Sequence, residues 1–246
     1  MAGYIELSPE LIKQMNDRFE KAHPKEILSW AADIFGDRVA AASSFQTQSI
    51  PLLHIISQTT PSLDVLFLDT GFHFPETLVY RDKLIKEMRL NVRVIKPTIE
   101  REQFLSNYGE LYRSDPDLCC YYNKVLPMQK ALAEYDAWVS GIRRDQTKER
   151  QNTPIIMLDT DGKYKINPLV NWTSQDIKLY RRNYNLPEHP LLEQGYTSIG
   201  CAPCTRPVRI GEDERSGRWA GQAKTECGLH IPKDELSKTA TGKFML

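Results

Sequence analysis

The sequence predicts an α/β protein with a mostly parallel, twisted sheet flanked by helices. Two observations carry this prediction. Short apolar runs over residues 39–42, 64–68, 92–95 and 137–140 have the length and composition of buried strands. The longer stretches between the first of these runs carry helical apolar spacing, and strands that alternate with helices in this way are typical of β-α-β units.

The remaining elements follow from start signals and turn residues. Pro75 occupies a first-turn position, which proline favours in helices. Asp161 and Gly162 separate two apolar runs and predict a hairpin turn, and a further helix begins near Thr173. The helices expected before this hairpin cover residues 9–20, 24–35, about 48–58 and 75–90.

The length of the chain fits one domain with a substantial appendage. Its 246 residues correspond to between one and two domains at roughly 150 residues each. After about Gly195 the periodicity fades into a stretch rich in glycine, proline and arginine that holds three of the five cysteines. We expect residues 1–195 to form an α/β core with N-terminal helices. Residues 196–246 are expected to be a tail that completes a site rather than a separate domain.

Composition and charge exclude several classes of protein. Hydrophobic residues make up 41% and charged residues 26%, which is ordinary for a globular chain. No apolar run reaches the roughly 18 residues of a membrane span, and the N-terminus lacks the pattern of a secretory signal. Lysine plus arginine and aspartate plus glutamate both number 32, so bulk charge gives no reason to expect nucleic-acid binding. We therefore expect a cytoplasmic protein without a membrane or nucleic-acid partner.

A polar loop, residues 43–49, follows the first predicted strand. In open α/β sheets ligands bind where a strand gives way to a helix, and free N–H groups at a helix start favour an anion. Hydroxyls of Ser43, Ser44, Thr47 and Ser49 would add donors. The Walker A and GxGxxG patterns are absent, which disfavours an ordinary P-loop. A polar turn of this kind also serves as a simple helix cap, and that alternative stays open.

The cysteines form two close pairs and one single residue. An odd number of cysteines in a chain that is expected to be cytoplasmic argues against a disulfide framework. Consecutive Cα atoms are about 3.8 Å apart, too close for an unstrained disulfide between Cys119 and Cys120. Together with Cys201 and Cys204 they offer four thiolates, which suit an iron–sulfur cluster or zinc. Zinc prefers pairs spaced C-x2–4-C, and ordinary thiols are the third alternative. The single residue is Cys227.

Six motifs resemble those of the iron–sulfur-containing assimilatory adenosine 5′-phosphosulfate reductases, within the phosphoadenosine phosphosulfate reductase family. The resemblance covers about residues 25–232 and implies an adenine nucleotide α-hydrolase-like (PP-loop) fold with a nucleotide-binding core. Asn123 departs from the family pattern, where arginine is common, and so removes one positive charge. The motifs are SSFQTQS at 43–49, LDTGFHFPET at 68–77, CCYYNKVLP at 119–127, GIRRDQTKER at 141–150, ERSGRW at 214–219 and ECGLH at 226–230.

The resemblance also implies a role for individual residues. Cys227 would be the nucleophile, assisted by His230, and Lys124 would lie between the substrate and one [4Fe–4S] cluster. The bulk of Phe45 and Gln46 would leave room for one phosphate in the loop rather than three. Cluster ligands would be Cys119, Cys120, Cys201 and Cys204. Substrate-binding residues would be Ser43, Ser44, Gln46, Thr47, Ser49, Asp69, Thr70, Gly71, Arg143, Arg150, Arg215 and Arg218, although Asp69 alone also fits a turn or capping residue.

The implied reaction transfers the sulfo group of adenosine 5′-phosphosulfate to Cys227, releases AMP, and then releases sulfite with reduced thioredoxin. A homo-oligomer is the assembly that the resemblance suggests. Three alternatives remain: a reductase of the 3′-phosphorylated substrate or of both substrates, an ATP-dependent RNA thiolase, and a non-catalytic zinc-binding module. Phe45 and Gln46 in place of loop glycines disfavour the thiolase. A zinc module would not need Cys227.

Overall fold

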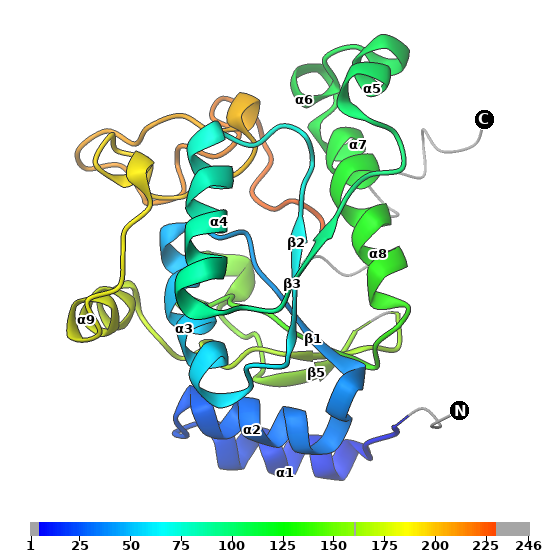
Figure 1. Ribbon diagram of the computed structural model, residues 1–246, viewed down its shortest axis with the longest axis vertical. Helices are drawn as coiled ribbons and strands as arrows, with labels where there is room; N and C mark the ends of the chain where they lie inside the picture. Colours follow the sequence, from blue (N-terminus) through cyan, green and yellow to red (C-terminus); the bar gives the residue numbers. More distant parts are fainter. Residues whose placement is uncertain (1–4, 160, 230–246) are drawn as a thin grey trace. The chain divides into compact units, whose positions relative to one another are not determined.

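The computed structural model describes residues 5–159 and 161–229 (Figure 1). The chain divides into two compact units. Unit 1 comprises Met1–Phe67, Val79–Arg93 and Leu132–His189, and unit 2 comprises Leu68–Leu78, Val94–Ala131 and the segment from Pro190 onward. The boundary expected at 195–196 falls inside the last segment of unit 2. The division into a core and a tail stays a prediction.

A six-stranded sheet confirms the predicted fold class. Its strand order is β3-β2-β1-β4-β6-β5. β1 pairs in parallel with β2 and β4, β4 pairs in parallel with β6, and only β5 runs antiparallel to its neighbour. The predicted hairpin is therefore an extension of the main sheet. The strands are β1 (Val39–Ala42), β2 (Asp64–Leu68), β3 (Val92–Ile95), β4 (Ala137–Val139), β5 (Ile156–Leu158) and β6 (Tyr164–Ile166).

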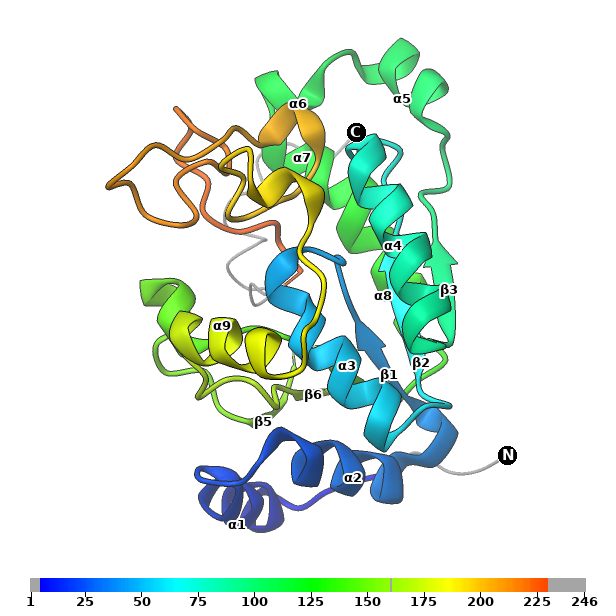
Figure 2. The ribbon, with the colours of Figure 1, turned by 60° about the vertical axis from the view of Figure 1, so that its left-hand side comes forward.

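The helices of unit 1 begin where the sequence carries capping residues. The Ser8 hydroxyl accepts a hydrogen bond from the Leu11 N–H at 3.1 Å, and Thr173 caps the last helix reciprocally with Asp176. α3 and α9 lie side by side (Figure 2). Among the described residues no helix has the length and apolar character needed to cross a membrane. The helices are α1 (Pro9–Phe19), α2 (Pro24–Phe35), α3 (Ile50–Thr59), α4 (Pro75–Met88), which begins in unit 2, and α9 (Ser174–Asn183).

The central strands form the core of unit 1. Val39, Ala40 and Ala41 of β1 are at most 2% exposed, and Val65 and Leu66 of β2 are fully buried. Strands of a parallel sheet covered on both faces are expected to be continuously apolar. This burial explains why the short runs could be recognised in the sequence.

Unit 2 contains helices that the sequence analysis did not anticipate. They surround a small core of Phe72, Phe104, Cys119 and Cys201. The segment from Pro190 onward contributes mostly loops and a 3₁₀ turn at Ala202–Cys204. The helices are α5 (Arg101–Tyr108), α6 (Leu111–Ser114), α7 (Pro116–Cys120), a π-helical turn (Tyr121–Val125) and α8 (Leu126–Leu132), whose last residue belongs to unit 1.

Candidate active site

The loop at 43–49 in unit 1 is held by its own side chains. The Ser43 hydroxyl accepts a hydrogen bond from the Phe45 N–H at 3.2 Å, and Gln46 Nε2 donates to Ser44 Oγ at 3.0 Å. Ser44 Oγ also lies 3.4 Å from Ser49 Oγ. These contacts close the loop locally, so its shape is set before any ligand binds.

Phe45 shapes the loop through its backbone. Its φ angle of 53° lies in the left-handed region, which non-glycine residues seldom adopt. The ring is 0% exposed and packs edge-on against Phe67, with ring centroids 5.5 Å apart. The bulk of Phe45 thus lies in the core of unit 1. The expectation that the loop has room for one phosphate rather than three stays a prediction.

The loop does not act as a side-chain cap of α3. Ser49 and Gln46 precede helical turns, yet neither makes a side-chain capping hydrogen bond. Thr47 is 4% exposed, and its hydroxyl has no hydrogen-bond partner among the described residues. A buried polar group without a partner is costly, so an anion that accepts from this hydroxyl would be favoured. These features support the anion-binding interpretation of the loop over the capping alternative.

Arg143 connects the loop to two other parts of unit 1. Its guanidinium donates to Gln48 Oε1 at 2.5 Å, to Asp145 Oδ1 at 2.9 Å and to Ser174 Oγ at 3.0 Å. The side chain is 1% exposed. Arg150, also buried, donates to Gln146, which in turn accepts from the Arg143 N–H at 3.1 Å. The two predicted substrate-binding arginines of this segment are therefore engaged by protein groups and position the loop.

The LDTG motif belongs to unit 2 and leads to the cysteines. Asp69 Oδ1 accepts a hydrogen bond from the Gly71 N–H at 3.0 Å, so Asp69 is a turn residue here. Thr70 is 3% exposed, and its hydroxyl accepts from the Phe72 N–H at 3.3 Å and lies 3.4 Å from Cys201 Sγ. The structure thus places Thr70 against a thiol. Substrate binding by Asp69, Thr70 and Gly71 stays a prediction.

The four paired cysteines lie together in unit 2, and we call them the thiol centre. Burial, followed by the neighbouring Cys120, Cys201 and Cys204, raises the pKa of Cys119 to about 12. Burial also raises the pKa of Cys204 to about 11, with Cys201 as the next cause. Such effects arise because ionising one thiol next to others in a low-dielectric site is unfavourable. Four thiols gathered in this way need a positively charged partner before they can ionise together.

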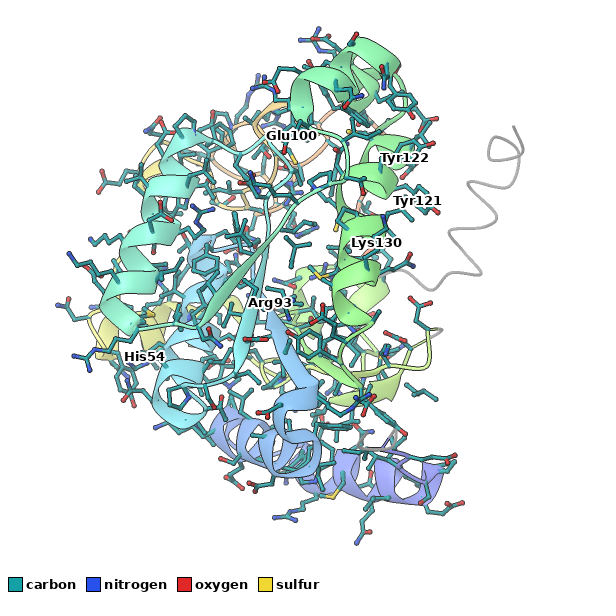
Figure 3. The ribbon with its side chains drawn as sticks, turned by 45° about the vertical axis from the view of Figure 1, so that its right-hand side comes forward. His54, Arg93, Glu100, Tyr121, Tyr122 and Lys130 are labelled. Atoms are coloured by element: carbon teal, nitrogen blue, oxygen red, sulfur yellow. The ribbon has the colours of Figure 1, made fainter. Side chains whose placement is uncertain are left out.

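The π-helical turn after Cys120 orients the residues that face the thiol centre. Asn123 is 3% exposed, and its amide donates to Cys119 O at 3.0 Å and to Cys119 Sγ at 3.7 Å. Tyr121 and Tyr122 belong to the same turn (Figure 3), and Tyr122 packs against the core that contains Cys119 and Cys201. The neutral amide of Asn123 therefore approaches a thiol where relatives are expected to carry a guanidinium.

Lys124 supplies positive charge to the thiol centre. Burial alone lowers the pKa of Lys124, but Cys201, Cys120 and Cys227 outweigh burial and raise it above its ordinary value. The ammonium group therefore stays charged at neutral pH. It interacts electrostatically with both pairs of the thiol centre and with the single cysteine. The role of Lys124 as a cation between the substrate and a cluster stays a prediction.

The arginines of the ERSGRW motif bind protein groups near the cysteines. Arg218 Nη1 donates to Ile199 O at 3.3 Å, and the guanidinium lies 4.4 Å from the ring centroid of Trp219. A Cβ atom at Gly200 would lie 2.4 Å from this guanidinium, so the close approach requires glycine. Arg215 Nη2 donates to Thr225 O at 3.1 Å. Direct substrate contacts by these arginines stay predictions.

Cys227 is one of two partly exposed cysteines in this arrangement. Cys204 is the other, whereas Cys119, Cys120 and Cys201 are at most 8% exposed. Electrostatic interactions with Cys120 and Lys124 place Cys227 near the thiol centre. The predicted assistant His230 lies outside the described residues. A partly exposed thiol beside an ammonium group has the surroundings of a reactive cysteine.

Sequence reasoning missed several residues that hold the site together. Gln48, Asp145 and Ser174 bind Arg143, while Lys224 and Asp117 form an ion pair between the tail and α7. Gln48 and Asp145 lie inside the motifs at 43–49 and 141–150, but the motifs do not show which side chains contact Arg143, and only proximity in space reveals these contacts.

Comparisons with known proteins extend over most of the chain. A model of the phosphoadenosine phosphosulfate reductase domain matches residues 38–207. The adenosine 5′-phosphosulfate reductase of Streptomyces coelicolor is 45% identical over 231 residues, which cover 92% of this chain and 97% of that protein. The phosphoadenosine 5′-phosphosulfate reductase of Gloeobacter violaceus is 42% identical over 224 residues, covering 89% and 93%.

A solved structure agrees with these sequence matches. The crystal structure of the phosphoadenylyl-sulfate reductase from Candida auris, determined as a phosphate complex, superposes with a TM-score of 0.72. Its sequence is 32% identical, and the match covers 81% of this chain and 98% of that one. The sheet and its helices are thus arranged as in that enzyme.

Proposed function

The chain belongs to the phosphoadenosine phosphosulfate reductase family, and from this premise we propose that it reduces adenosine 5′-phosphosulfate to sulfite and AMP during sulfate assimilation, with reduced thioredoxin as electron donor. The placement of Cys227 carries the proposal. This partly exposed thiol interacts with Lys124 and Cys120 within unit 2. A nucleophile beside fixed positive charge suits attack on a sulfate group that carries negative charge.

The reaction proceeds in two displacements at sulfur. The Cys227 thiolate attacks the sulfur of the sulfo group, the bond between that sulfur and the phosphate oxygen breaks, and AMP leaves as the phosphate anion. The enzyme then carries an S-sulfocysteine. A thioredoxin thiolate attacks Cys227 Sγ and displaces sulfite, and the second thioredoxin thiol resolves the mixed disulfide. The dithiol donates two electrons and two protons overall, so Cys227 returns to its thiol form.

Each chemical group of the substrate has its own binding residues in this proposal. The loop at 43–49 receives the 5′-phosphate through its N–H groups and through Ser43, Ser44, Gln46, Thr47 and Ser49. Arg143 and Arg150 keep that loop in shape. Asp69, Thr70 and Gly71 receive the adenosine, while Arg215 and Arg218 attract the phosphosulfate. Lys124 offsets the charge that develops on the sulfo group, and His230 assists Cys227.

The thiol centre fits an iron–sulfur cluster. In the described part of the chain no three His, Cys, Asp or Glu side chains gather tightly enough to hold a single metal ion, as closed zinc sites do. A [4Fe–4S] cluster needs one thiolate for each iron, so its ligands are spaced more widely. Among the described groups, Trp219 Nε1 and Arg218 Nε are buried donors without a partner, and an anionic cluster would attract them. We assign Cys119, Cys120, Cys201 and Cys204 as its ligands.

The cluster, when bound, supplies negative charge and a rigid link between the two cysteine pairs. Lys124 balances that charge and favours an anionic substrate beside it. Thr70 and Asn123 contribute neutral donors near Cys201 and Cys119. These side chains organise charge around the reacting groups, and the electrons for reduction come from thioredoxin.

Anaerobic purification followed by metal analysis and mass spectrometry tests the proposal. We expect a brown protein with about four irons per chain. Incubation with adenosine 5′-phosphosulfate should add a sulfo group to the peptide that contains Cys227. A colourless zinc protein without an adduct would contradict both the cluster and the nucleophile. Pyrophosphate release from ATP in the presence of RNA would instead support a thiolase.

The 3′-phosphorylated substrate is the second candidate, because the Gloeobacter relative of similar identity carries that name. The four thiol-centre cysteines favour the unphosphorylated substrate, since cluster-lacking relatives are expected to use the 3′-phosphorylated one. Measured kcat/KM values for the two nucleotides decide between them. A clear preference for the 3′-phosphorylated substrate would overturn our assignment, and equal values would indicate a dual-substrate enzyme.

A further inference from the structure

Lys224 lies three residues before Cys227 and is not a surface lysine. Its side chain is 7% exposed. The ammonium group forms an ion pair with Asp117 and lies 5.4 Å from the ring centroid of Trp219. A buried ammonium group is unfavourable unless charge and hydrogen bonds compensate for its lost hydration. The surroundings of Lys224 provide a carboxylate and an aromatic face for this purpose.

Both groups that hold Lys224 are attached to the thiol centre. Asp117 stands in the first turn of α7, two residues before Cys119. Trp219 is 3% exposed, and its N–H donates to Cys204 O at 3.0 Å. One lysine therefore contacts a residue beside each cysteine pair.

The residues between Lys224 and Cys227 are held as well. Thr225 O accepts from Arg215 at 3.1 Å, and Glu226 Oε2 lies 3.7 Å from Arg215 Nη2. Glu226 is 6% exposed. Three consecutive residues before the nucleophile are thus attached to the rest of unit 2 through side-chain contacts. Loops without such attachments lose conformational entropy when they present a nucleophile, and that cost is avoided here.

We propose that Lys224 is a positioning residue, which fixes the segment carrying Cys227 to α7 and Trp219 so that the thiol stays next to Cys120 and Lys124. The inference rests on the proposed role of Cys227 as nucleophile. Asp117 and the Trp219 ring are the anchors. Lys224 itself touches neither substrate nor reacting atoms in this assignment. Its loss releases the Cys227 segment while the substrate-binding loop of unit 1 keeps its own contacts.

Lys224→Met in the iron-loaded enzyme is the principal variant. We expect Cys227 to react with iodoacetamide about tenfold faster and to form the sulfo adduct about tenfold more slowly in a single turnover, as expected for losing an ion pair and a cation–π contact. The affinity for AMP should stay unchanged. Lys224→Arg keeps the charge and the aromatic contact, and it should restore most of both rates.

Asp117→Asn removes only the ion pair. Asp117 is 57% exposed, so this variant should fold even if Lys224→Met does not. It should raise the alkylation rate and lower the rate of adduct formation, each by about threefold, the size of an ion-pair loss. Lys83→Met is the matched control, because Lys83 forms a surface ion pair with Glu87 in α4 and is 53% exposed. Neither rate should change in the control.

The rates of alkylation and of adduct formation distinguish a failure of the positioning role of Lys224 from a failure of the proposed function. If Lys224→Met and Asp117→Asn both alkylate and form the adduct at wild-type rates, Lys224 does not position Cys227. If the wild-type enzyme forms no adduct, the proposed function fails, and the alkylation rates alone still decide whether Lys224 holds the segment. A loss of AMP affinity equal to the loss of adduct rate would assign Lys224 to substrate binding and overturn the inference.

Discussion

The loop at 43–49 in unit 1 and the thiol centre in unit 2 are built in opposite ways. Apart from Thr47, the loop groups bind one another or Arg143, whose guanidinium has three protein partners. The thiol centre gathers buried thiols whose pKa values burial and mutual proximity raise. Buried side-chain atoms without partners among the described residues occur in both units, for example Thr47 Oγ1 in unit 1 and Trp219 Nε1 in unit 2.

The difference shows that the loop at 43–49 and the thiol centre are kept in shape by different interactions. Most polar side chains of the loop in unit 1 have partners within the chain, although the Thr47 hydroxyl has none among the described residues. The thiol centre needs a bound group to balance its charges. Changes in the loop of unit 1 should therefore affect stability and substrate affinity, whereas changes at the thiol centre should affect the chemical step and cofactor content.

The largest expected effect comes from Cys227→Ser. A hydroxyl at this position is a far weaker nucleophile than a thiolate, so kcat should fall by at least about 1,000-fold. Iron content and AMP affinity should stay at wild-type levels, because Cys227 is not assigned to either. Steady-state kinetics, iron analysis and calorimetry measure the three quantities. Residual sulfite production within tenfold of the wild type would assign the nucleophile to another residue.

Removal of iron should be the next largest perturbation. Chelation after mild oxidation leaves the four thiols of the thiol centre, three of them buried, without their positive partners, and metal binding in such sites is coupled to folding. We expect activity to fall by about 100-fold and amide exchange to increase around Cys119–Cys120 and Cys201–Cys204. Exchange in β1 of unit 1 should not change. If amide exchange increased equally in both units, the order of unit 1 would also depend on the bound iron.

Much of the fold could be predicted, because unit 1 follows simple rules. Val39–Ala42 and Asp64–Leu68 are apolar throughout since both faces of these parallel strands are covered. Unit 2 could not be predicted in the same way. α5 is short and mostly polar, and contacts distant in sequence, such as Phe72 against Phe104, hold it. A π-helical turn lacks the apolar spacing by which an α-helix is recognised in a sequence.

The sequence could predict which residues belong to the candidate site, but not how their side chains are oriented. The two cysteine pairs and Lys124 could be placed together from motifs, and the structure brings them together in unit 2. Motifs did not indicate the direction of a side chain. Arg143 carries a guanidinium suited to phosphate, yet its partners here are Gln48, Asp145 and Ser174. Only the packing of the chain decides whether such a group faces a ligand or a neighbouring loop.

Arg143→Met should have a moderate effect that separates these two roles. Loss of the buried cation removes its hydrogen bonds to Gln48, Asp145 and Ser174, and breaking such a buried network costs about 3 kcal/mol. The free energy of unfolding should fall by about that amount, and KM should rise about tenfold through loss of loop order. Denaturant unfolding and steady-state kinetics measure both quantities.

The neighbouring Arg144→Met is the matched control for Arg143. Arg144 pairs with Glu20, and the two side chains are 29% and 51% exposed. Its loss should cost at most about 1 kcal/mol and leave KM unchanged. If Arg143→Met raised KM without lowering stability, the guanidinium would contact substrate directly and the loop of unit 1 would not depend on it.

The smallest effect is expected at Glu212, a carboxylate of the unit 2 loops that accepts hydrogen bonds from three residues. It accepts hydrogen bonds from Arg206 at 2.8 Å, from the Arg209 N–H at 2.9 Å and from Ser216 Oγ at 3.3 Å. The Arg206 guanidinium and these donors lower the pKa of Glu212 to about 2. Because the folded-state pKa is depressed, the contribution to loop order is complete above the ordinary pKa of about 4.5 and disappears as pH falls toward 2.

Amide exchange over residues 206–216 can measure this contribution. Glu212→Gln should increase exchange there at pH 7 by about twofold and should remove most of the difference between pH 7 and pH 3, while exchange in β1 stays unchanged. The exposed position of the pair means that added salt should reduce the wild-type protection as well. An effect as large as that of iron removal would show that the unit 2 loops are ordered by their own contacts. The contrast with unit 1 would then be one of degree, because both regions would draw their order from the chain itself.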